Sequence, residues 1–263
     1  MMKKSNTAKK TNSKNTDLSL VIPMYNEVER VGRAVDALNS FLPKQDFIHE
    51  VIFVDDGSRD DTVAKLHSLK PKFNYLVVGY PNNHGKGHAL RKGMQKATGK
   101  YVLFLDVDMS TPIEELRKFK PWMEDGYHVI IGTRKAHGAN LVKRQAPLRQ
   151  KMGEVFTILS NLAIGGGVTD FTCGFKCFSK EAAQKIWDAE TIDRWGFDTE
   201  ILFLAKKFGY SITELPVVWA NDERTRVSLV KDAARSLTDL FKIRYNDLMG
   251  IYEQKPRRKS SKS

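Results

Sequence analysis

The chain has 263 residues, of which 41% are hydrophobic and 28% are charged, a composition typical of a globular protein with a substantial buried core. Its formal net charge of +12 would favour nucleic acid or an anionic membrane as a partner. However, residues 1–16 and 255–263 contribute +10 of this charge, and the chain between them is nearly balanced. This distribution argues against nucleic acid.

The two ends of the chain are rich in lysine and arginine. We expect disordered basic tails at 1–16 and 253–263 around one domain at 17–252. Such tails are either solvated or attracted to an anionic membrane, by about 1 kcal/mol per basic residue near its surface. No segment has the roughly 18 apolar residues of a spanning helix, and the N-terminus lacks an apolar signal core. We therefore expect a cytoplasmic protein, peripheral at most at the cytoplasmic membrane face.

The first half of the domain alternates between strands and helices. Short apolar runs predict five buried strands, at 18–23, 50–54, 75–80, 101–105 and 128–131. Helical spacing of apolar residues predicts helices after the first two strands, and a further helix follows the third. Thr111, Pro112 and Glu114 have the spacing of a capping box at the start of the next helix. The repeated pattern predicts an α/β, Rossmann-like fold, with a mostly parallel central sheet and helices on both faces.

The second half is less regular. We expect helices at 147–164, 197–208 and 227–252 and a strand at 212–219. Cys173 and Cys177 are expected to be reduced thiols, because two cysteines alone cannot complete a zinc site. The last helix has an apolar stripe that either packs on the domain or docks partly into a membrane interface. Its residues are Leu229, Val230, Ala233, Leu237, Leu240, Phe241 and Leu248.

Polar clusters follow four of the predicted strands. They lie at 23–27 (PMYNE), 55–58 (DDGS), 82–87 (NNHGKG) and 106–108 (DVD). In parallel α/β sheets, ligands bind beyond the carboxyl ends of the strands. We therefore expect these clusters to line one ligand crevice.

Asp106 and Asp108 are two residues apart, so their side chains share one face of an extended segment. Neighbouring carboxylates repel each other unless a cation or a proton lies between them. Mg²⁺ or Mn²⁺ takes hard oxygen ligands and commonly shares its shell with substrate phosphates. The pair directly after a buried strand therefore predicts a metal site that also holds a phosphorylated ligand.

Two other clusters have both a ligand-binding and a structural interpretation. Asp55 and Asp56 are candidates to recognise a base and a ribose, although DDGS could instead be a strand-to-helix turn with a helix cap. Gly85 and Gly87 permit close backbone approach, and Lys86 between them could neutralise a phosphate. This loop is not a P-loop, because the P-loop spacing is missing.

Taken together, the clusters resemble those of glycosyltransferase family 2, whose inverting members have the GT-A fold. The resemblance covers roughly 17–245. The CGFK and RWGFDTE segments make the chain most similar to dolichyl- and polyprenyl-phosphate sugar synthases, especially dolichyl-phosphate glucosyltransferases. The matching stretches are 21–27, 54–62, 82–94, 106–108, 131–134, 169–178, 194–201 and 226–240.

The resemblance implies a nucleotide-sugar donor, a Mg²⁺ or Mn²⁺ ion and inversion at the anomeric carbon. UDP-glucose is the favoured donor, with GDP-mannose as the alternative, and the acceptor is a polyprenyl or dolichyl phosphate. By motif, the implied site residues are Pro23, Tyr25, Glu27 and Asp56 at the nucleoside, Asp106 and Asp108 at the diphosphate and metal, Arg226 near the diphosphate, and Arg134 and Arg149 at the acceptor phosphate.

Two positions depart from the family pattern. Ser110 stands where mannose-type lipid-phosphate synthases often have a Gln metal ligand, and Arg226 stands where Lys is common. A lipid phosphate is already anionic and attacks without a strong base, so positioning and leaving-group stabilisation would supply catalysis. The alternative acceptor is a sugar or glycan hydroxyl, in polysaccharide or glycolipid synthesis. That acceptor requires a base, for which Asp198 and Asp170 are the candidates. Asp198 could instead cap the helix that follows it.

Overall fold

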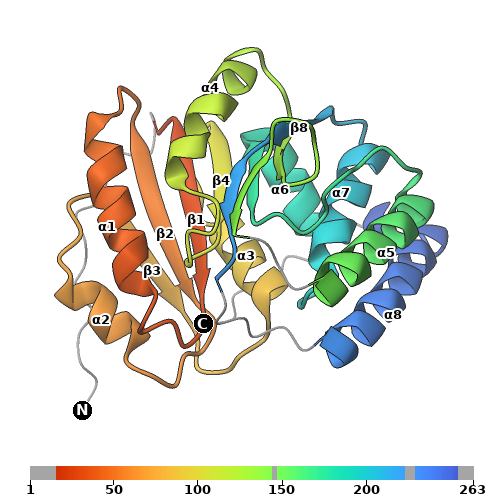
Figure 1. Ribbon diagram of the computed structural model, residues 1–263, viewed down its shortest axis with the longest axis horizontal. Helices are drawn as coiled ribbons and strands as arrows, with labels where there is room; N and C mark the ends of the chain where they lie inside the picture. The colour runs from red at the N-terminus through yellow and green to blue at the C-terminus, as the bar shows by residue number, and fades with distance from the viewer. Residues whose placement is uncertain (1–15, 144–146, 223–228, 254–263) are drawn as a thin grey trace, which may run out of the picture.

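The computed structural model describes residues 16–143, 147–222 and 229–253. Its centre is a seven-stranded sheet in the order β3-β2-β1-β4-β7-β5-β8 (Figure 1). The strands are β1 (Leu18–Met24), β2 (His49–Asp55), β3 (Tyr75–Gly79), β4 (Tyr101–Leu105), β5 (Val129–Thr133), β7 (Phe175–Ser179) and β8 (Ile212–Pro216). Only β7 runs antiparallel to its neighbours, so the prediction of a mostly parallel sheet is confirmed.

Helices cover both faces of this sheet, because successive side chains of a buried strand point to opposite sides. In β1, Val21 packs toward one helical layer while Leu20 and Ile22 pack toward the other. One layer comprises α1 (Val31–Phe41), α2 (Thr62–Ser68) and α4 (Leu116–Glu124), and the other comprises α3 (Lys86–Met94), α6 (Lys180–Ala189) and α7 (Phe197–Lys207). Beside α7, α5 (Pro147–Ile164) packs against α8 (Leu229–Leu248).

The second half contains a strand and a helix that the apolar pattern did not predict. β7 inserts between β4 and β5 and is followed directly by α6. A lysine, Lys176, interrupts the apolar run of β7 and is nevertheless fully buried. A charged residue at a core position hides the strand from a hydrophobicity pattern, because such residues are rarely buried without a partner.

Two predicted local structures are wrong. The strand expected at 212–219 is split into β8 and β9 (Val218–Ala220), and β9 pairs instead with β6 (Asn140–Lys143) in a separate sheet. The capping box at Thr111 does not form in the described structure, since Pro112 is extended and the chain enters a 3₁₀ turn, η2 (Ile113–Glu115), before α4. Thr111 Oγ1 lies 3.9 Å from Cys173 Sγ instead.

The apolar residues of the last helix lie partly against the domain and partly in solvent. Leu240 is buried against the domain, whereas Leu237, Phe241 and Leu248 are exposed. α8 is followed by a 3₁₀ turn, η3 (Ile251–Glu253). The expected basic tails lie outside the described residues, apart from their innermost positions. Within the part of the chain that the structure describes, no helix is both long and apolar enough to cross a membrane. Both cysteines are free, as predicted, and both are buried.

Candidate active site

A cleft of about 1290 Å³ opens at the carboxyl ends of β1, β2 and β4 and extends to α5 and α8. It brings together most of the predicted site residues, namely Pro23, Tyr25, Glu27, Asp56, Lys86, Asp106, Asp108, Arg134 and Asp198. Asp55 lies outside the described lining of this cleft. Arg149 lies in the first turn of α5 but its side chain is not described, and Arg226 lies outside the described residues.

The first two polar loops hold each other in place at the edge of the cleft. Asn26 has a left-handed backbone with φ of 52°. Its N–H donates to Ser58 Oγ at 2.9 Å, and its Oδ1 accepts from the Arg59 N–H at 2.7 Å. The Glu27 N–H donates to Thr62 Oγ1 at 2.6 Å. Side-chain partners thus fix the backbone of 23–27 against the DDGS turn.

Asp56 fastens the glycine-containing loop to the end of β2. Its buried carboxylate accepts from Asn83 Nδ2 at 2.6 Å, from the His84 N–H at 2.9 Å and from the Gly85 N–H at 2.8 Å. Asp55 accepts from the Ser58 N–H at 3.1 Å and closes the turn. The strand-to-helix turn expected of DDGS is therefore present, but the expected cap is not: in the described structure α2 has Asp61 at its N-cap with no side-chain cap hydrogen bond. A contact of Asp56 with the nucleoside stays a prediction.

The two glycines around Lys86 make room for protein and not only for a ligand. A Cβ on Gly85 would lie 2.5 Å from the Asp193 carbonyl oxygen, and one on Gly87 would lie 2.3 Å from that of Ile192. These contacts exclude a side chain at both positions. The glycine pair therefore lets the loop before α7 pack directly on the start of α3.

Lys86 lies between the acidic pair and two aromatic rings. Its Nζ is 2.6 Å from Asp106 Oδ1 and 5.8 Å from the ring centroids of both Trp195 and Phe197. Burial opposes a charge on this lysine, but the carboxylates of Asp106 and Asp198 outweigh burial and raise its pKa. Lys86 is thus a fixed cation beside the metal site predicted from sequence.

The acidic pair faces the cleft because of the local backbone. Val107 is buried in the core, so Asp106 and Asp108 on either side of it both line the cleft. Met109 has φ of 53°, and this turn allows the Ser110 N–H to donate to Asp108 Oδ1 at 2.9 Å. Burial and the neighbouring Asp106 charge raise the pKa of Asp108. Both carboxylates face the same cleft, as expected, but the segment is a turn closed by the Met109 N–H donating to the Asp106 carbonyl oxygen at 3.1 Å, and not the extended backbone on which the prediction rested.

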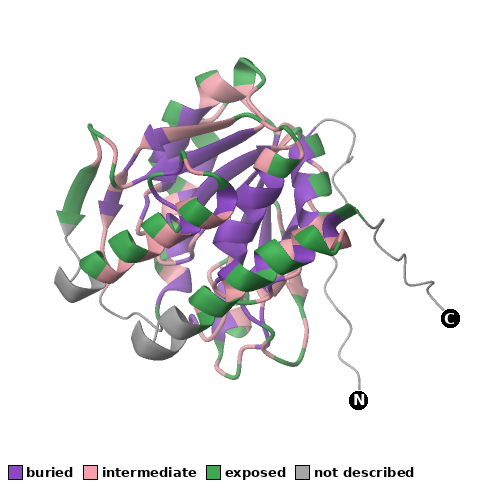
Figure 2. Cartoon of the chain, turned by 90° about the vertical axis from the view of Figure 1, so that its right-hand side faces the viewer, coloured by how far each residue is buried: buried purple, intermediate pink, exposed green. Residues whose placement is uncertain are grey.

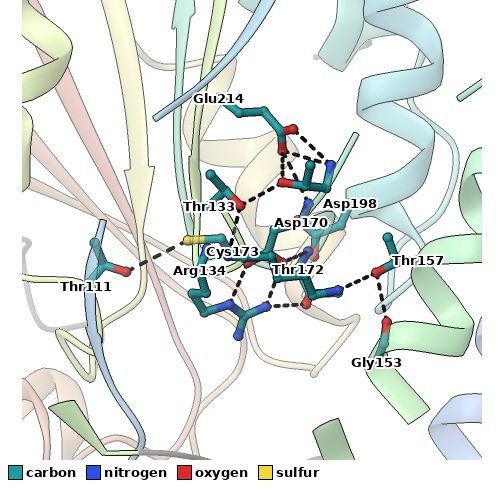
Figure 3. A network of polar contacts seen from close by, with 12 residues as sticks. Thr111, Thr133, Arg134, Gly153, Thr157, Asp170, Thr172, Cys173, Asp198 and Glu214 are labelled. Carbon is teal, nitrogen blue, oxygen red and sulfur yellow. Dashed lines mark hydrogen bonds and ion pairs between the residues drawn. The ribbon is translucent and has the colours of Figure 1, made fainter. Parts of the chain in front are cut away.

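Arg134, at the end of β5, is oriented by Asp170 (Figure 3). Its Nε and Nη2 donate to the two carboxylate oxygens of Asp170, each at 2.7 Å. Nη2 also donates to Thr172 Oγ1 at 2.7 Å, and the guanidinium lies 5.2 Å from the Trp219 ring centroid. Burial alone would raise the pKa of Asp170, but Arg134 holds it well below its usual range. Both carboxylate oxygens of Asp170 are thus engaged by Arg134, and this geometry favours an orienting role for Asp170.

Asp198 enters the cleft from the first turn of α7. Its Oδ1 accepts from Lys176 Nζ at 2.6 Å, and Lys176 also donates to the Cys173 carbonyl oxygen at 2.8 Å. Gly196 occupies the N-cap of α7, and the described structure has no side-chain cap there, so the helix-cap interpretation of Asp198 is wrong. Burial raises the pKa of Asp198, while Lys176 and Lys86 oppose this rise. Asp198 therefore has a buried lysine beneath it and Lys86 beside it.

Sequence reasoning had assigned no role to several residues of the site. Lys176 contacts Asp198, Trp219 lies beside Arg134, and Arg194 and Trp195 line the cleft. Lys176 and Trp195 lie within the CGFK and RWGFDTE segments that carried the resemblance. Those two motifs were the available signal for them, but the motifs did not specify which group each side chain contacts.

Comparisons with known proteins agree with this geometry. The family model for glycosyl transferase family 2 matches residues 19–187. The dolichyl-phosphate beta-glucosyltransferase of Dictyostelium discoideum is 31% identical over 255 residues, covering 92% of this chain and 78% of the relative. The human protein of the same name is 30% identical over 257 residues, covering 92% and 79%.

A solved structure of glucosyl-3-phosphoglycerate synthase from Mycobacterium tuberculosis, in complex with Mn²⁺, UDP and glucosyl-3-phosphoglycerate, has a similar fold. It aligns with a TM-score of 0.66 and 18% identity, over 88% of this chain and 80% of that one. The fold is the GT-A type of glycosyltransferases. The chain belongs to glycosyltransferase family 2, and the resemblance read from its motifs is confirmed.

Proposed function

We propose that this protein transfers glucose from UDP-glucose to the phosphate of dolichol or another polyprenol, with inversion at the anomeric carbon. Relatives at 30–32% identity are named for β-glucosyl transfer to dolichyl phosphate. A structural neighbour is described in complex with Mn²⁺ and UDP-glucose. One observation in this chain carries the proposal: Lys86 and Arg134 both line the cleft that also holds the acidic pair and Asp198. A donor-side cation and an acceptor-side cation therefore meet in one cleft.

Asp106 and Asp108 are the proposed ligands of Mg²⁺ or Mn²⁺. The pair fits such an ion, because both carboxylates line the cleft and the pKa of Asp108 is raised by burial and by the Asp106 charge. The described residues contain no cluster of three or more potential His, Cys, Asp or Glu ligands, so phosphate oxygens and water would complete the shell. When bound, the ion would neutralise charge on the leaving diphosphate.

The donor side of the reaction is served by residues near the carboxyl ends of β1, β2 and β4. Pro23, Tyr25 and Glu27 line the cleft beside the acidic pair and are proposed to bind the nucleoside. Lys86 is placed to stabilise charge on the diphosphate as the bond to the sugar breaks. Arg226 is proposed to assist Lys86, on the strength of its motif alone.

The acceptor side is served by Arg134. A phosphate monoester has a second pKa of about 6 and is anionic at neutral pH, so its oxygen can form the bond to the anomeric carbon without losing a proton first. The bond between the anomeric carbon and the diphosphate oxygen breaks, and UDP leaves with the electron pair of that bond. Arg134 is held rigidly by Asp170 and Trp219, which favours precise placement of the acceptor phosphate. Arg149 precedes α5 residues that line the cleft, and this position supports its proposed role beside Arg134.

A substrate screen tests the proposal. The purified protein is incubated with UDP-glucose or GDP-mannose, with dolichyl phosphate, dolichol or a free sugar, and with Mn²⁺, Mg²⁺ or a chelator. We expect glucosyl transfer only from UDP-glucose, only to dolichyl phosphate and only with the metal present. Transfer to a free sugar hydroxyl without any lipid phosphate would contradict the proposal and favour Asp198 as the base of a hydroxyl-glycosylating enzyme.

A further inference from the structure

The exposed apolar side chains of this protein are concentrated on one surface. Of the twelve large hydrophobic residues that are exposed in the described chain, eight lie on α5, on α8 or directly after α8. We call this surface the α5–α8 face; Figure 2 views the molecule from this side. Its residues are Val155, Ile158, Leu162, Leu237, Phe241, Tyr245, Leu248 and Met249.

The spacing of these residues gives each helix two apolar sides, one packed on the domain and one exposed to solvent. On α8, Leu240 and Ile243 are buried against the domain, while Phe241 is 78% exposed and Leu248 is 80% exposed. On α5, Leu162 is 77% exposed. Since α5 packs along α8, the two outer stripes form a single surface. Contiguous exposed apolar area of this kind is uncommon on monomeric proteins and marks an interaction site.

The charges around the face are mainly positive. The exposed cations Lys151, Arg235, Lys242 and Arg244 lie on the same two helices. Of the acids on the described parts of the two helices, Glu154 on α5 is exposed, Asp239 on α8 packs on Gly196, and Asp247 Oδ1 lies 2.6 Å from Lys207 Nζ. Residues 229–263 contain nine Lys or Arg and four Asp or Glu, and five of these basic residues follow the described chain. An apolar stripe bordered by cations is complementary to an anionic lipid surface.

The face is also continuous with the cleft. Val155 on α5 and Leu237 on α8 line the cleft, and both are exposed members of the face. From these two residues the stripes continue along α5 to Leu162 and along α8 to Leu248. A molecule with a phosphate at Arg134 and a long hydrocarbon chain could therefore leave the cleft along this surface without its chain entering water.

We propose that the α5–α8 face docks on an anionic phospholipid bilayer, and that the lipid-phosphate acceptor enters the cleft from the bilayer between α5 and α8. The second half of this statement rests on the proposed function, whereas the first half does not. A bilayer fits the face better than a second copy of the chain, because two copies would bring the same cations together.

Flotation with lipid vesicles tests the docking directly. The full chain is mixed with phosphatidylcholine vesicles with and without phosphatidylserine, in the absence of any substrate. The double variant Phe241→Glu/Leu248→Glu is compared with Ile48→Glu/Leu76→Glu, which adds the same charge at exposed apolar positions outside the face. We expect the first variant to bind anionic vesicles at least about tenfold more weakly and the second to bind like the wild type. Equal binding by all three would overturn the proposal.

Two further measurements separate the possible causes of a failure. If the glutamates prevent folding, the same comparison is made with Phe241→Ser/Leu248→Ser and Ile48→Ser/Leu76→Ser. Light scattering shows whether the face is a dimer interface, and a change from dimer to monomer in the Phe241/Leu248 variant with unchanged vesicle binding would also overturn the proposal.

Turnover distinguishes docking from the proposed function. A water-soluble short-chain polyprenyl phosphate should be glucosylated equally by the wild type and by Phe241→Glu/Leu248→Glu. Dolichyl phosphate embedded in vesicles should be glucosylated at least about tenfold more slowly by that variant. Absence of turnover on either acceptor, together with normal vesicle binding, would refute the proposed function and leave docking intact. Equal turnover of both proteins on the embedded acceptor would refute entry from the bilayer along this face.

Discussion

The two sides of the cleft are built differently. On the proposed donor side, loops at consecutive strand ends are fastened by hydrogen bonds between side chain and backbone, as between Asp56 and the Gly85 N–H. On the proposed acceptor side, charged side chains are held by buried ion pairs with one another, such as Arg134 with Asp170 and Lys176 with Asp198. The donor side depends on backbone geometry and the acceptor side on charge pairing, so different substitutions should disrupt them.

The largest effect on stability is expected at the buried ion pair beneath the cleft. Lys176→Met leaves the Asp198 carboxylate buried without its lysine, which should lower the free energy of unfolding by about 3–5 kcal/mol. Urea denaturation measures this change. The double variant Lys176→Met/Asp198→Leu should regain most of the loss, because neither charge is then buried alone. A single Lys176→Met variant as stable as the exposed-lysine control Lys96→Met would show that the pair contributes little.

A smaller, pH-dependent effect is expected at Asp170. Asp170→Asn should lower the free energy of unfolding by about 2–3 kcal/mol at neutral pH, since charge-assisted bonds to Arg134 are weakened. Arg134 depresses the pKa of Asp170 in the folded protein. The stability that this carboxylate contributes is therefore present above its unfolded pKa of about 3.9 and is lost as the pH falls toward the folded pKa.

The difference between the wild type and Asp170→Asn should consequently shrink at acid pH. Denaturation curves at several pH values down to the acid limit of folding measure it. A difference that stays constant below pH about 4 would contradict the depressed pKa of Asp170.

The smallest of the three effects tests the donor side. Gly57 has φ of 70°, and a Cβ there would lie 2.6 Å from the Asn82 carbonyl carbon. Gly57→Ala should therefore lower the free energy of unfolding by about 1–3 kcal/mol and weaken UDP binding, because the loops at 55–58 and 82–87 would separate. The matched control is Gly32→Ala in α1, where a Cβ meets nothing within 4 Å; there alanine should stabilise the helix by up to about 1 kcal/mol. Equal stability of the two variants would contradict this account of the turn.

The same contrast explains how much could be predicted from the sequence. Asp106, Asp108 and Lys86 directly follow buried strands or glycines, so topology alone brings them to one edge of the sheet. By contrast, Arg134 and Asp170 are 36 positions apart, and Lys176 and Asp198 are 22 apart. No local periodicity encodes such pairs, because each depends on the tertiary placement of β7 and α7. The strand β7 and the role of Lys176 were missed for the same reason. A lysine at a core position can be predicted only when its partner, here Asp198, is known.

The proposed function requires that the acidic pair and its cleft transfer glucose with inversion to a lipid phosphate. Proton and phosphorus NMR of the product formed from UDP-glucose and a short-chain polyprenyl phosphate tests it most directly. We expect a β-linked glucosyl phosphate from the wild type and from the exposed-aspartate control Asp188→Asn, and at least about 100-fold less from Asp108→Asn. An α-linked product, or an undiminished rate for Asp108→Asn, would contradict it.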